Sequence, residues 1–402
     1  MTDTEIAPET TPSEAAPAQP APADQAAPLA VTPLHALHVA HGARMVGFAG
    51  YDMPVQYADG ILAEHAHTRN AAGLFDVSHM GQAFLLGPDH ETVARALETL
   101  VPADIVNLGV GRQRYTQFLD GDGHILDDLM VTRSADPTED GVLMLVVNAG
   151  RKEADFAHLA AALPAGVKLL RADHRALIAL QGPQAAQVLA RHSADTADMP
   201  FMSALSTRFD GIECHVSRSG YTGEDGYEIS VKAPRVRAIA ERLLGHREIK
   251  LIGLGARDSL RLEAGLCLYG HDIDTTTSPV EAGLAWSIQK RRRDEGGFPG
   301  AERVLGELQQ GPRRRRVGIA PDGRMPAREG AEVRATDGTP IGKVTSGGFG
   351  PTVGTPIAMG YVDAPYAQPG TPVTLMVRTK ELSAKVVVLP FVPHRYHRAA
   401  QT

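Results

Sequence analysis

Two adjacent carboxylates, Asp127 and Asp128, lie inside an otherwise apolar stretch, residues 125–131 (ILDDLMV). We expect a strand here, where burying an unpaired charge is unfavourable, so the pair is a candidate functional site. Side chains alternate across a strand, so the two aspartates face opposite ways. Periodicity alone does not say which one faces a pocket. The structural alternative is that one aspartate caps a turn and the other faces water.

A second candidate site is the loop and strand at residues 217–229 (SRSGYTGEDGYEI), which has three glycines, two tyrosines and four charged residues. A minimal hairpin turn needs far fewer residues of these types, so the loop is expected to bind a ligand. Glu228 lies at the start of the returning strand, where its carboxylate can accept two parallel hydrogen bonds from a planar pair of donors. The alternative is that Glu228 pairs with a nearby arginine while the tyrosines pack on the sheet.

The segment 253–258 (GLGARD) begins like a dinucleotide-binding fingerprint, but Asp258 stands where the third glycine belongs. An acidic side chain there would repel a pyrophosphate, so this site is rejected. We expect a helix over residues 258–266, with Asp258 at its N-terminus. Arg257 then either lies in a cleft and holds a carboxylate, or lies with Arg261 on a solvated face.

The segment 75–80 (FDVSHM) contains an aspartate, a serine and a histidine. Residues that alternate along one strand cannot all point together, so a local catalytic triad is rejected. His79 is more often structural than catalytic, and His65 and His67 have no metal-like partners nearby in the sequence.

The elements that must position these residues form a mixed α and β unit over residues 33–274. Strands are expected at 113–119, 124–132, 142–148 and 176–180, sharing one sheet, with a hairpin turn at 120–123. After residue 290 the pattern changes to short strands separated by Gly and Pro, which predicts a small all-β barrel or sandwich. Arginine runs at 291–293 and 313–316 flank a linker, either as solvated surface or as a contact for an acidic partner.

Composition excludes several classes of protein. A net charge of -7 and 22% charged residues do not favour nucleic acid. No apolar run approaches the roughly 20 residues of a membrane span. The two cysteines, Cys214 and Cys267, are far apart, which fits a reducing compartment, and we expect the cytoplasm. Residues 1–29 are rich in Ala, Pro and acidic residues, so they predict a disordered tail that is not an export signal.

Taken in order, these motifs resemble the glycine-cleavage T-protein family over about residues 33–396. The matching segments include GARM at 42–45, FAGYDMPV at 48–55, the segments at 75–80, 125–129, 220–228 and 253–258, and RLEA at 261–264. An ordered set is more specific than any one member. The family usually has tryptophan where Tyr51 stands here.

The resemblance implies an α+β, three-lobed folate-binding T-protein fold around a central folate channel. It implies two α/β lobes over residues 30–290, a linker at 291–312 and a C-terminal β-barrel domain at 313–397. It also implies an aminomethyltransferase of the glycine cleavage system, which moves the methylene carbon of an aminomethyl-dihydrolipoyl H protein to tetrahydrofolate and releases ammonia. Tetrahydrofolate is then a co-substrate, the lipoylated H protein is the partner, and no metal is required.

The resemblance also chooses between the aspartates, because Asp128 matches the family's essential acid. The positions that match residues associated with folate are Tyr115, Asn148, Tyr221, Glu228, Arg257 and Tyr396.

Two relatives of the same fold are the alternatives: a tetrahydrofolate-dependent demethylase and a noncatalytic folate-binding protein. Noncatalytic relatives contain a segment similar to K-G-C-[YF]-x-G-Q. The segment 266–271 (LCLYGH) does not match this pattern. Fused flavin demethylases carry a dinucleotide-binding domain that is absent here, whereas standalone demethylases share much of the site.

Overall fold

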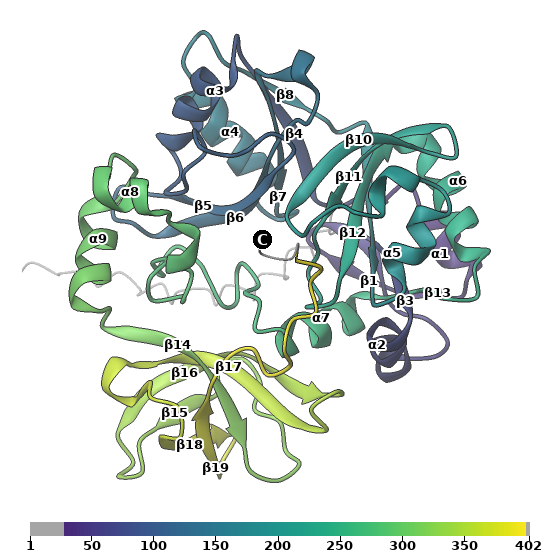
Figure 1. Ribbon diagram of the computed structural model, residues 1–402. Coiled ribbons are helices and arrows are strands. Elements are labelled where there is room, and N and C mark those ends of the chain that lie inside the picture. Colours follow the sequence, from purple (N-terminus) through teal and green to yellow (C-terminus); the bar gives the residue numbers. More distant parts are fainter. Residues whose placement is uncertain (1–27, 399–402) are drawn as a thin grey trace, which may run out of the picture.

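The computed structural model describes residues 28–398, so the tail predicted over residues 1–29 lies outside the described residues up to position 27. Three lobes surround a common centre (Figure 1). Two are mixed α/β lobes built on separate sheets and the third is a closed β-barrel, which confirms the predicted three-lobed α+β fold. The predicted site residues come from the first two lobes and from the segment that follows the barrel.

The first lobe is a five-stranded sheet in the order β5-β6-β7-β4-β8, with helices α3 (His90–Glu98) and α4 (Lys152–Ala162). Its strands are β4 (Gly81–Leu86), β5 (Gln113–Leu119), β6 (Ile125–Arg133), β7 (Val142–Val147) and β8 (Lys168–Arg171). The predicted hairpin at 120–123 joins β5 to β6 in antiparallel register. Alternate residues of β6, including Leu129 and Val131, are buried in this lobe's core, so the intervening residues face away from it.

The second lobe is a six-stranded sheet in the order β10-β11-β12-β9-β3-β13. Its strands are β3 (Ala72–Asp76), β9 (Arg175–Gln181), β10 (Ser203–Phe209), β11 (Ile212–Arg218), β12 (Gly226–Lys232) and β13 (Ile249–Leu251). The prediction that residues 176–180 share a sheet with 113–148 is wrong, because they form β9, which pairs with β3 and β12. Strand β9 is apolar on both faces because it lies between two layers of core.

The remaining elements of this lobe are the hairpin of β1 (Arg44–Phe48) and β2 (Tyr51–Gln56), and helices α1 (His35–Ala40), α2 (Ile61–Asn70), α5 (Ala185–Ala190), α6 (Ala233–Leu244) and α7 (Leu254–Glu263). Helix α7 begins four residues earlier than predicted. A Cβ at Gly253 would lie 2.4 Å from the backbone oxygen of Val55, so glycine lets the helix start pack closely against β2.

This earlier start corrects two sequence interpretations. Asp258 lies within α7 rather than at its N-terminus, and Arg261 is buried rather than on a solvated face. The Arg261 guanidinium forms ion pairs with Asp258 at 2.8 Å and with the buried Asp272 at 2.6 Å.

The third lobe is a closed barrel in the order β14-β17-β16-β15-β18-β19, which decides between the predicted barrel and sandwich. Its strands are β14 (Arg314–Pro321), β15 (Glu332–Arg334), β16 (Pro340–Gly350), β17 (Thr355–Asp363), β18 (Pro372–Val377) and β19 (Lys380–Val387). Strand β14 closes the barrel by pairing with β17 along one edge and with β19 along the other.

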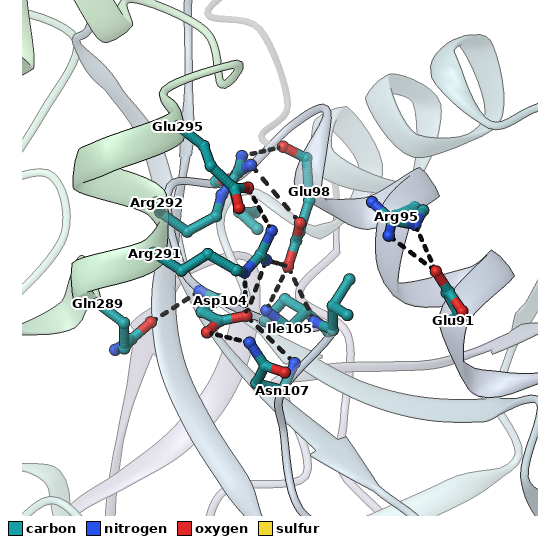
Figure 2. Close-up of polar contacts among 12 residues, drawn as sticks. Glu91, Arg95, Glu98, Asp104, Ile105, Asn107, Gln289, Arg291, Arg292 and Glu295 are labelled. Atoms are coloured by element: carbon teal, nitrogen blue, oxygen red, sulfur yellow. Dashed lines mark hydrogen bonds and ion pairs between the residues drawn. The ribbon is translucent and has the colours of Figure 1, made fainter.

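Between the second lobe and the barrel, the chain forms helices α8 (Lys290–Glu295) and α9 (Ala301–Gln310). Helix α8 is attached to the first lobe through Glu98 and Asp104 (Figure 2). Glu98 accepts hydrogen bonds from the backbone N–H groups of Ile105 and Val106 at 2.7 and 2.8 Å, and it also pairs with Arg291. The Asp104 carboxylate accepts a 2.7 Å hydrogen bond from Arg291. The backbone N–H of Asp104 donates a hydrogen bond to the side-chain oxygen of Gln289.

These contacts change the interpretation of the arginine runs. Arg291 and the buried Arg292 both form ion pairs with Glu98. These arginines therefore attach α8 to the first lobe. In the second run, Arg316 donates to the backbone oxygens of Ala282 and Gly265. Arg313 and Arg315 are the exposed members.

Candidate functional site

The side chains of Asp127 and Asp128 project from opposite faces of β6, as the alternation of side chains along a strand predicted. Asp127 is fully buried, whereas Asp128 is only partly buried. The Tyr115 hydroxyl, from the neighbouring strand β5, donates a 2.8 Å hydrogen bond to Oδ2 of Asp128. Asp128 is therefore the carboxylate on the accessible face of the sheet.

Asn148 follows the last residue of β7 and lies beside both aspartates. Its side-chain amide donates to Oδ1 of Asp128 at 2.6 Å and to Oδ1 of Asp127 at 2.9 Å. Its backbone N–H donates to Oδ2 of Asp127 at 3.1 Å. One residue thus fixes both carboxylates, and three predicted site residues, Tyr115, Asp128 and Asn148, form one hydrogen-bonded group.

The surroundings of Asp128 favour its neutral form. Burial, followed by the negative charge of Asp127, raises the pKa of Asp128 to about 7, and the hydrogen bonds from Tyr115 and Asn148 oppose this rise. Asp128 therefore changes charge near neutral pH, unlike an exposed aspartate. A group with such a pKa can carry negative charge and exchange a proton under the same conditions.

Asp155 was not identified from the sequence, although it interacts with Asp127. It lies in the first turn of α4 and is buried within hydrogen-bonding reach of Asp127. Burial raises the pKa of both carboxyl groups, and the charge of Asp155 raises that of Asp127 further. The pair retains a proton at higher pH than exposed carboxyl groups do, which limits the negative charge behind Asp128. The only sequence feature that could have indicated Asp155 is an acidic residue within a partly apolar helix.

Glu228, Arg257 and Tyr221 form a second group. The Arg257 guanidinium lies 4.8 Å from the centre of the Tyr221 ring, as in a cation–π contact. Burial raises the pKa of Glu228, and the positive charge of Arg257 opposes the rise. The Tyr221 hydroxyl donates a short hydrogen bond to the backbone oxygen of Cys267. Arg257 is therefore partly buried beside Tyr221 rather than on a solvated face.

This second group has unused hydrogen-bonding capacity. Within the described residues, Nη1 of Arg257 is buried without a partner, and the hydrogen bond found for the Glu228 carboxylate is a 3.3 Å bond from Ser219. Buried groups of this kind ordinarily have partners, so the arrangement fits a ligand with adjacent planar donors and an acceptor. A pterin ring has such groups.

The two groups are neighbours. Asp128 and Arg257 both act electrostatically on the Tyr221 hydroxyl, whose pKa burial raises above its ordinary value. Asp128 and Cys267 likewise both act on Tyr115. The Tyr221 hydroxyl is therefore close to both Asp128 and Arg257.

Trp286, also missed from the sequence, stacks on Tyr115 with ring centres 5.5 Å apart and an interplanar angle of 22°. The indole is 60% exposed, so one of its faces remains open. Trp286 is the only tryptophan of the chain, and this is the only sequence feature that could have marked it as a site residue. An exposed aromatic face beside Asp128 provides an apolar surface for a flat ligand.

Tyr396 lies apart from the other predicted site residues. Its ring stacks on Phe201 at 4.0 Å and tilts against His394 at 4.8 Å. The segment containing it returns from the barrel to the centre (Figure 1), where the Arg395 backbone N–H donates to Gly223. Among the described residues, no hydrogen bond joins Tyr396 to the other six.

The segment 75–80 contains no triad. Asp76 accepts hydrogen bonds from Thr32 at 2.6 Å and is bonded to His38 at 2.9 Å, away from His79. Burial, with Arg257 nearby, lowers the pKa of His79 to about 4, so this histidine is neutral near neutral pH.

In the part of the chain that the structure describes, no group of three or more His, Cys, Asp or Glu side chains has the arrangement of a metal site. No helix of residues 28–398 has the length and apolar character needed to cross a membrane.

Two family models match the chain: the GCVT N-terminal domain over residues 34–292 and the glycine cleavage T-protein C-terminal barrel domain over residues 314–393. The mitochondrial aminomethyltransferase of Gallus gallus is 48% identical over 375 residues, covering 92% of this chain and 94% of that protein. The human protein of the same name is 44% identical and covers 91% of each chain.

A solved structure is also similar. The glycine cleavage system aminomethyltransferase T from Bartonella henselae is 44% identical, with a TM-score of 0.86. The match covers 92% of this chain and all of the solved chain.

Proposed function

The chain belongs to the glycine cleavage T-protein family and is an aminomethyltransferase, and from this premise we propose how its residues carry out the reaction. The substrate is an aminomethyl group on a dihydrolipoyl sulfur of the H protein. Its carbon–sulfur and carbon–nitrogen bonds break while two bonds from the carbon to folate nitrogens form. The two hydrogens that those nitrogens lose leave with the sulfur and with ammonia, so atoms balance.

Asp128 is the residue that acts at the reacting carbon. Positive charge develops on this carbon as its bonds break, and an ionised carboxylate nearby stabilises that charge. Two opposite unit charges about 4 Å apart attract by roughly 1 kcal/mol in water and roughly 4 kcal/mol at the effective dielectric of a protein surface site. The partly buried position of Asp128 makes its charge more effective than an exposed one.

Tyr115 and Asn148 keep Asp128 in one orientation and favour its ionised form, because both donate to its carboxylate. Fixed donors avoid reorganisation during the reaction. The pKa near 7 also lets Asp128 receive a proton from a folate nitrogen and pass it on at neutral pH.

Tetrahydrofolate, when bound, supplies the nucleophilic nitrogens that accept the carbon. We assign Glu228 to the paired donors of its pterin ring, and Arg257 to a pterin acceptor and to the orientation of Glu228. Tyr221 supports Arg257 through the 4.8 Å cation–π contact. Tyr396 is assigned to the mouth of the channel, since it lies apart from the other six residues.

The buried Nη1 of Arg257, which has no partner among the described residues, together with the partly buried and sparsely bonded Glu228, supports folate binding most strongly. The buried cysteines Cys214 and Cys267, which form no disulfide with each other, support a reducing compartment such as the cytoplasm.

Production of 5,10-methylenetetrahydrofolate and ammonia from tetrahydrofolate and aminomethylated H protein tests the proposal. We expect Asp128→Asn to lower turnover at least about 100-fold while tetrahydrofolate affinity changes less. Asp173→Asn, which neutralises an exposed aspartate paired with Arg171, is the matched control. Equal turnover in Asp128→Asn would remove the electrostatic role. Tight folate binding without transfer would instead favour a demethylating or noncatalytic relative.

A further inference from the structure

A cavity of about 570 Å³ lies between the facing sheets of the two α/β lobes. One wall comes from β4, β6 and β7 of the first lobe, and the other from β9, β10, β11 and β12 of the second. Its volume is in the range of small-molecule sites, which are often found between domains. None of the seven predicted site residues lines it.

The wall from the second lobe is cationic because of strand register. Arg175 on β9 is paired directly with Lys232 on β12, so the two side chains lie on the same face of the sheet. His215 on β11 pairs with Ser230, two residues before Lys232, and therefore shares that face. Like charges directly opposite each other are unfavourable, and a bound anion would offset this repulsion.

Arg175 is held in a fixed orientation without a carboxylate partner. Its Nε donates to the Ser230 hydroxyl at 2.7 Å and its Nη2 to the Ser230 backbone oxygen at 2.9 Å. Within residues 28–398, Nη1 of Arg175 makes no hydrogen bond, and no acidic side chain forms an ion pair with this guanidinium. A partly buried arginine without a counterion is unusual, since burial disfavours its charge.

The other charged residues that line the cavity, Arg208, Glu213 and Glu139, have partners of their own. Arg208 and Glu213 form a 2.8 Å ion pair in which both side chains are well exposed. Glu139 accepts a hydrogen bond from Ser134. Nε2 of His215 is buried and has no partner in the described part of the chain, which adds a second unused group beside Arg175.

The opposite wall carries four apolar side chains besides the polar Thr132, Ser134 and Glu139. Phe84 and Leu86 on β4 pair with Met144 and Val142 on β7, so the four side chains share one face. All four line the cavity. An occupant would therefore meet apolar side chains on one side and fixed positive charge on the other.

The cavity is separate from the site around Asp128, although it uses the same strands. Thr132 lies four residues beyond Asp128 on β6, and Lys232 lies four residues beyond Glu228 on β12. Four strand residues span about 13 Å. An apolar cluster that includes Met144, Val146 and Leu177 occupies the interface between the lobes.

We propose that this cavity binds an amphipathic organic anion, with its carboxylate or phosphate group on Arg175 and its apolar part against Phe84, Leu86, Val142 and Met144. Arg175 provides the free Nη1 donor for the anion, and Lys232 adds charge from the opposite strand. The site is distinct from the folate and aminomethyl sites.

Titration calorimetry with three probes of one shape tests the proposal: benzoate, phenyl phosphate and neutral benzyl alcohol. We expect at least one of the two anions to bind and benzyl alcohol to bind at least tenfold more weakly. The preferred anion identifies the carboxylate or the phosphate as the recognised group. Equal affinity for benzyl alcohol, or no binding of either anion, overturns the proposal.

Variants assign the binding to the cavity. Arg175→Gln should weaken anion binding at least tenfold, and the milder Lys232→Gln should weaken it severalfold even if Arg175→Gln folds poorly. Arg237→Gln is the matched control, because Arg237 is exposed on α6 and pairs with Glu241 outside the cavity. Arg257→Gln should leave the affinity unchanged. Anion binding that depends on Arg257, or that survives both Arg175→Gln and Lys232→Gln, contradicts the assignment.

Discussion

The hydroxyl of Tyr115 donates a 2.8 Å hydrogen bond to Oδ2 of Asp128. The donor comes from β5 and the acceptor from β6, and this bond lowers the pKa that burial raises to about 7. The ionisation of Asp128 therefore depends on a neighbouring strand as well as on its own position.

Tyr115→Phe should shift the acidic limb of the pH–activity profile upward. A hydrogen bond to a charged group contributes about 1.5–3 kcal/mol, which corresponds to about one to two pH units. The substitution raises the pKa of Asp128, so the carboxylate becomes protonated at a higher pH than in the unaltered protein. As the pH is lowered, activity should therefore begin to fall earlier. The pH dependence of kcat/KM measures the shift, with Tyr366→Phe in the barrel as the control. An unchanged acidic limb would show that ionisation of Asp128 does not limit the reaction.

Asn148→Asp should reduce transfer about 100-fold near neutral pH. The change replaces an amide that donates to Asp127 and Asp128 with another acid, so charge repulsion raises the pKa of Asp128 further. Single-turnover transfer rates at several pH values measure this effect. Asn70→Asp, at an exposed position near the end of α2, is the control. A rate near that of the unaltered protein would exclude Asn148 as a determinant of the Asp128 charge.

Asp155→Asn should stabilise the protein more at high pH than at low pH. A carboxyl whose pKa is raised on folding binds more protons in the folded state than in the unfolded state, so its ionisation lowers stability as pH rises. The variant removes one of the two raised carboxyl groups and a charge beside Asp127. Urea unfolding from about pH 5 to about pH 8 measures the difference in the free energy of unfolding. A difference that shrinks with rising pH would contradict the assigned direction.

Glu228→Gln and Arg257→Gln should each weaken tetrahydrofolate binding about 10- to 100-fold, with effects that are not additive. Each substitution leaves the other charge buried without its neighbour, so the double variant should bind better than the summed losses predict. Equilibrium binding of tetrahydrofolate to the four proteins of the cycle measures the coupling. Glu213→Gln, which removes the charge of an exposed side chain that pairs with Arg208, is the control. Additive effects would show that the two residues act separately.

Glu98→Gln should destabilise the protein by about 3 kcal/mol, because it leaves the Arg291 and Arg292 charges without their shared buried partner (Figure 2). Glu91→Gln, on the same helix, breaks an exposed pair with Arg95 and should change stability by no more than about 0.5 kcal/mol. Chemical unfolding of both variants gives the comparison. Equal effects would show that the Glu98 cluster does not hold α8 in place.

Several features were determined by local sequence. The alternation in residues 125–131 places Asp127 and Asp128 on opposite faces of β6, because successive side chains of any strand do so. The hairpin at 120–123 and the strands at 113–119 and 142–147 follow from turn residues and apolar runs in the same way. The resemblance of ordered motifs also identified the family and, through it, the three-lobed fold.

Tertiary structure alone decided what surrounds these residues. Residues 176–180 have an apolar pattern that suits either sheet, and pairing with β3 and β12 placed them in the second lobe. The Asp127–Asp155 contact, the stacking of Trp286 on Tyr115 and the burial of Arg261 join segments whose spacing carries no periodic signal. A pKa depends on burial and on charges within a few ångströms, so the raised pKa of Asp128 was set only when separate strands came together.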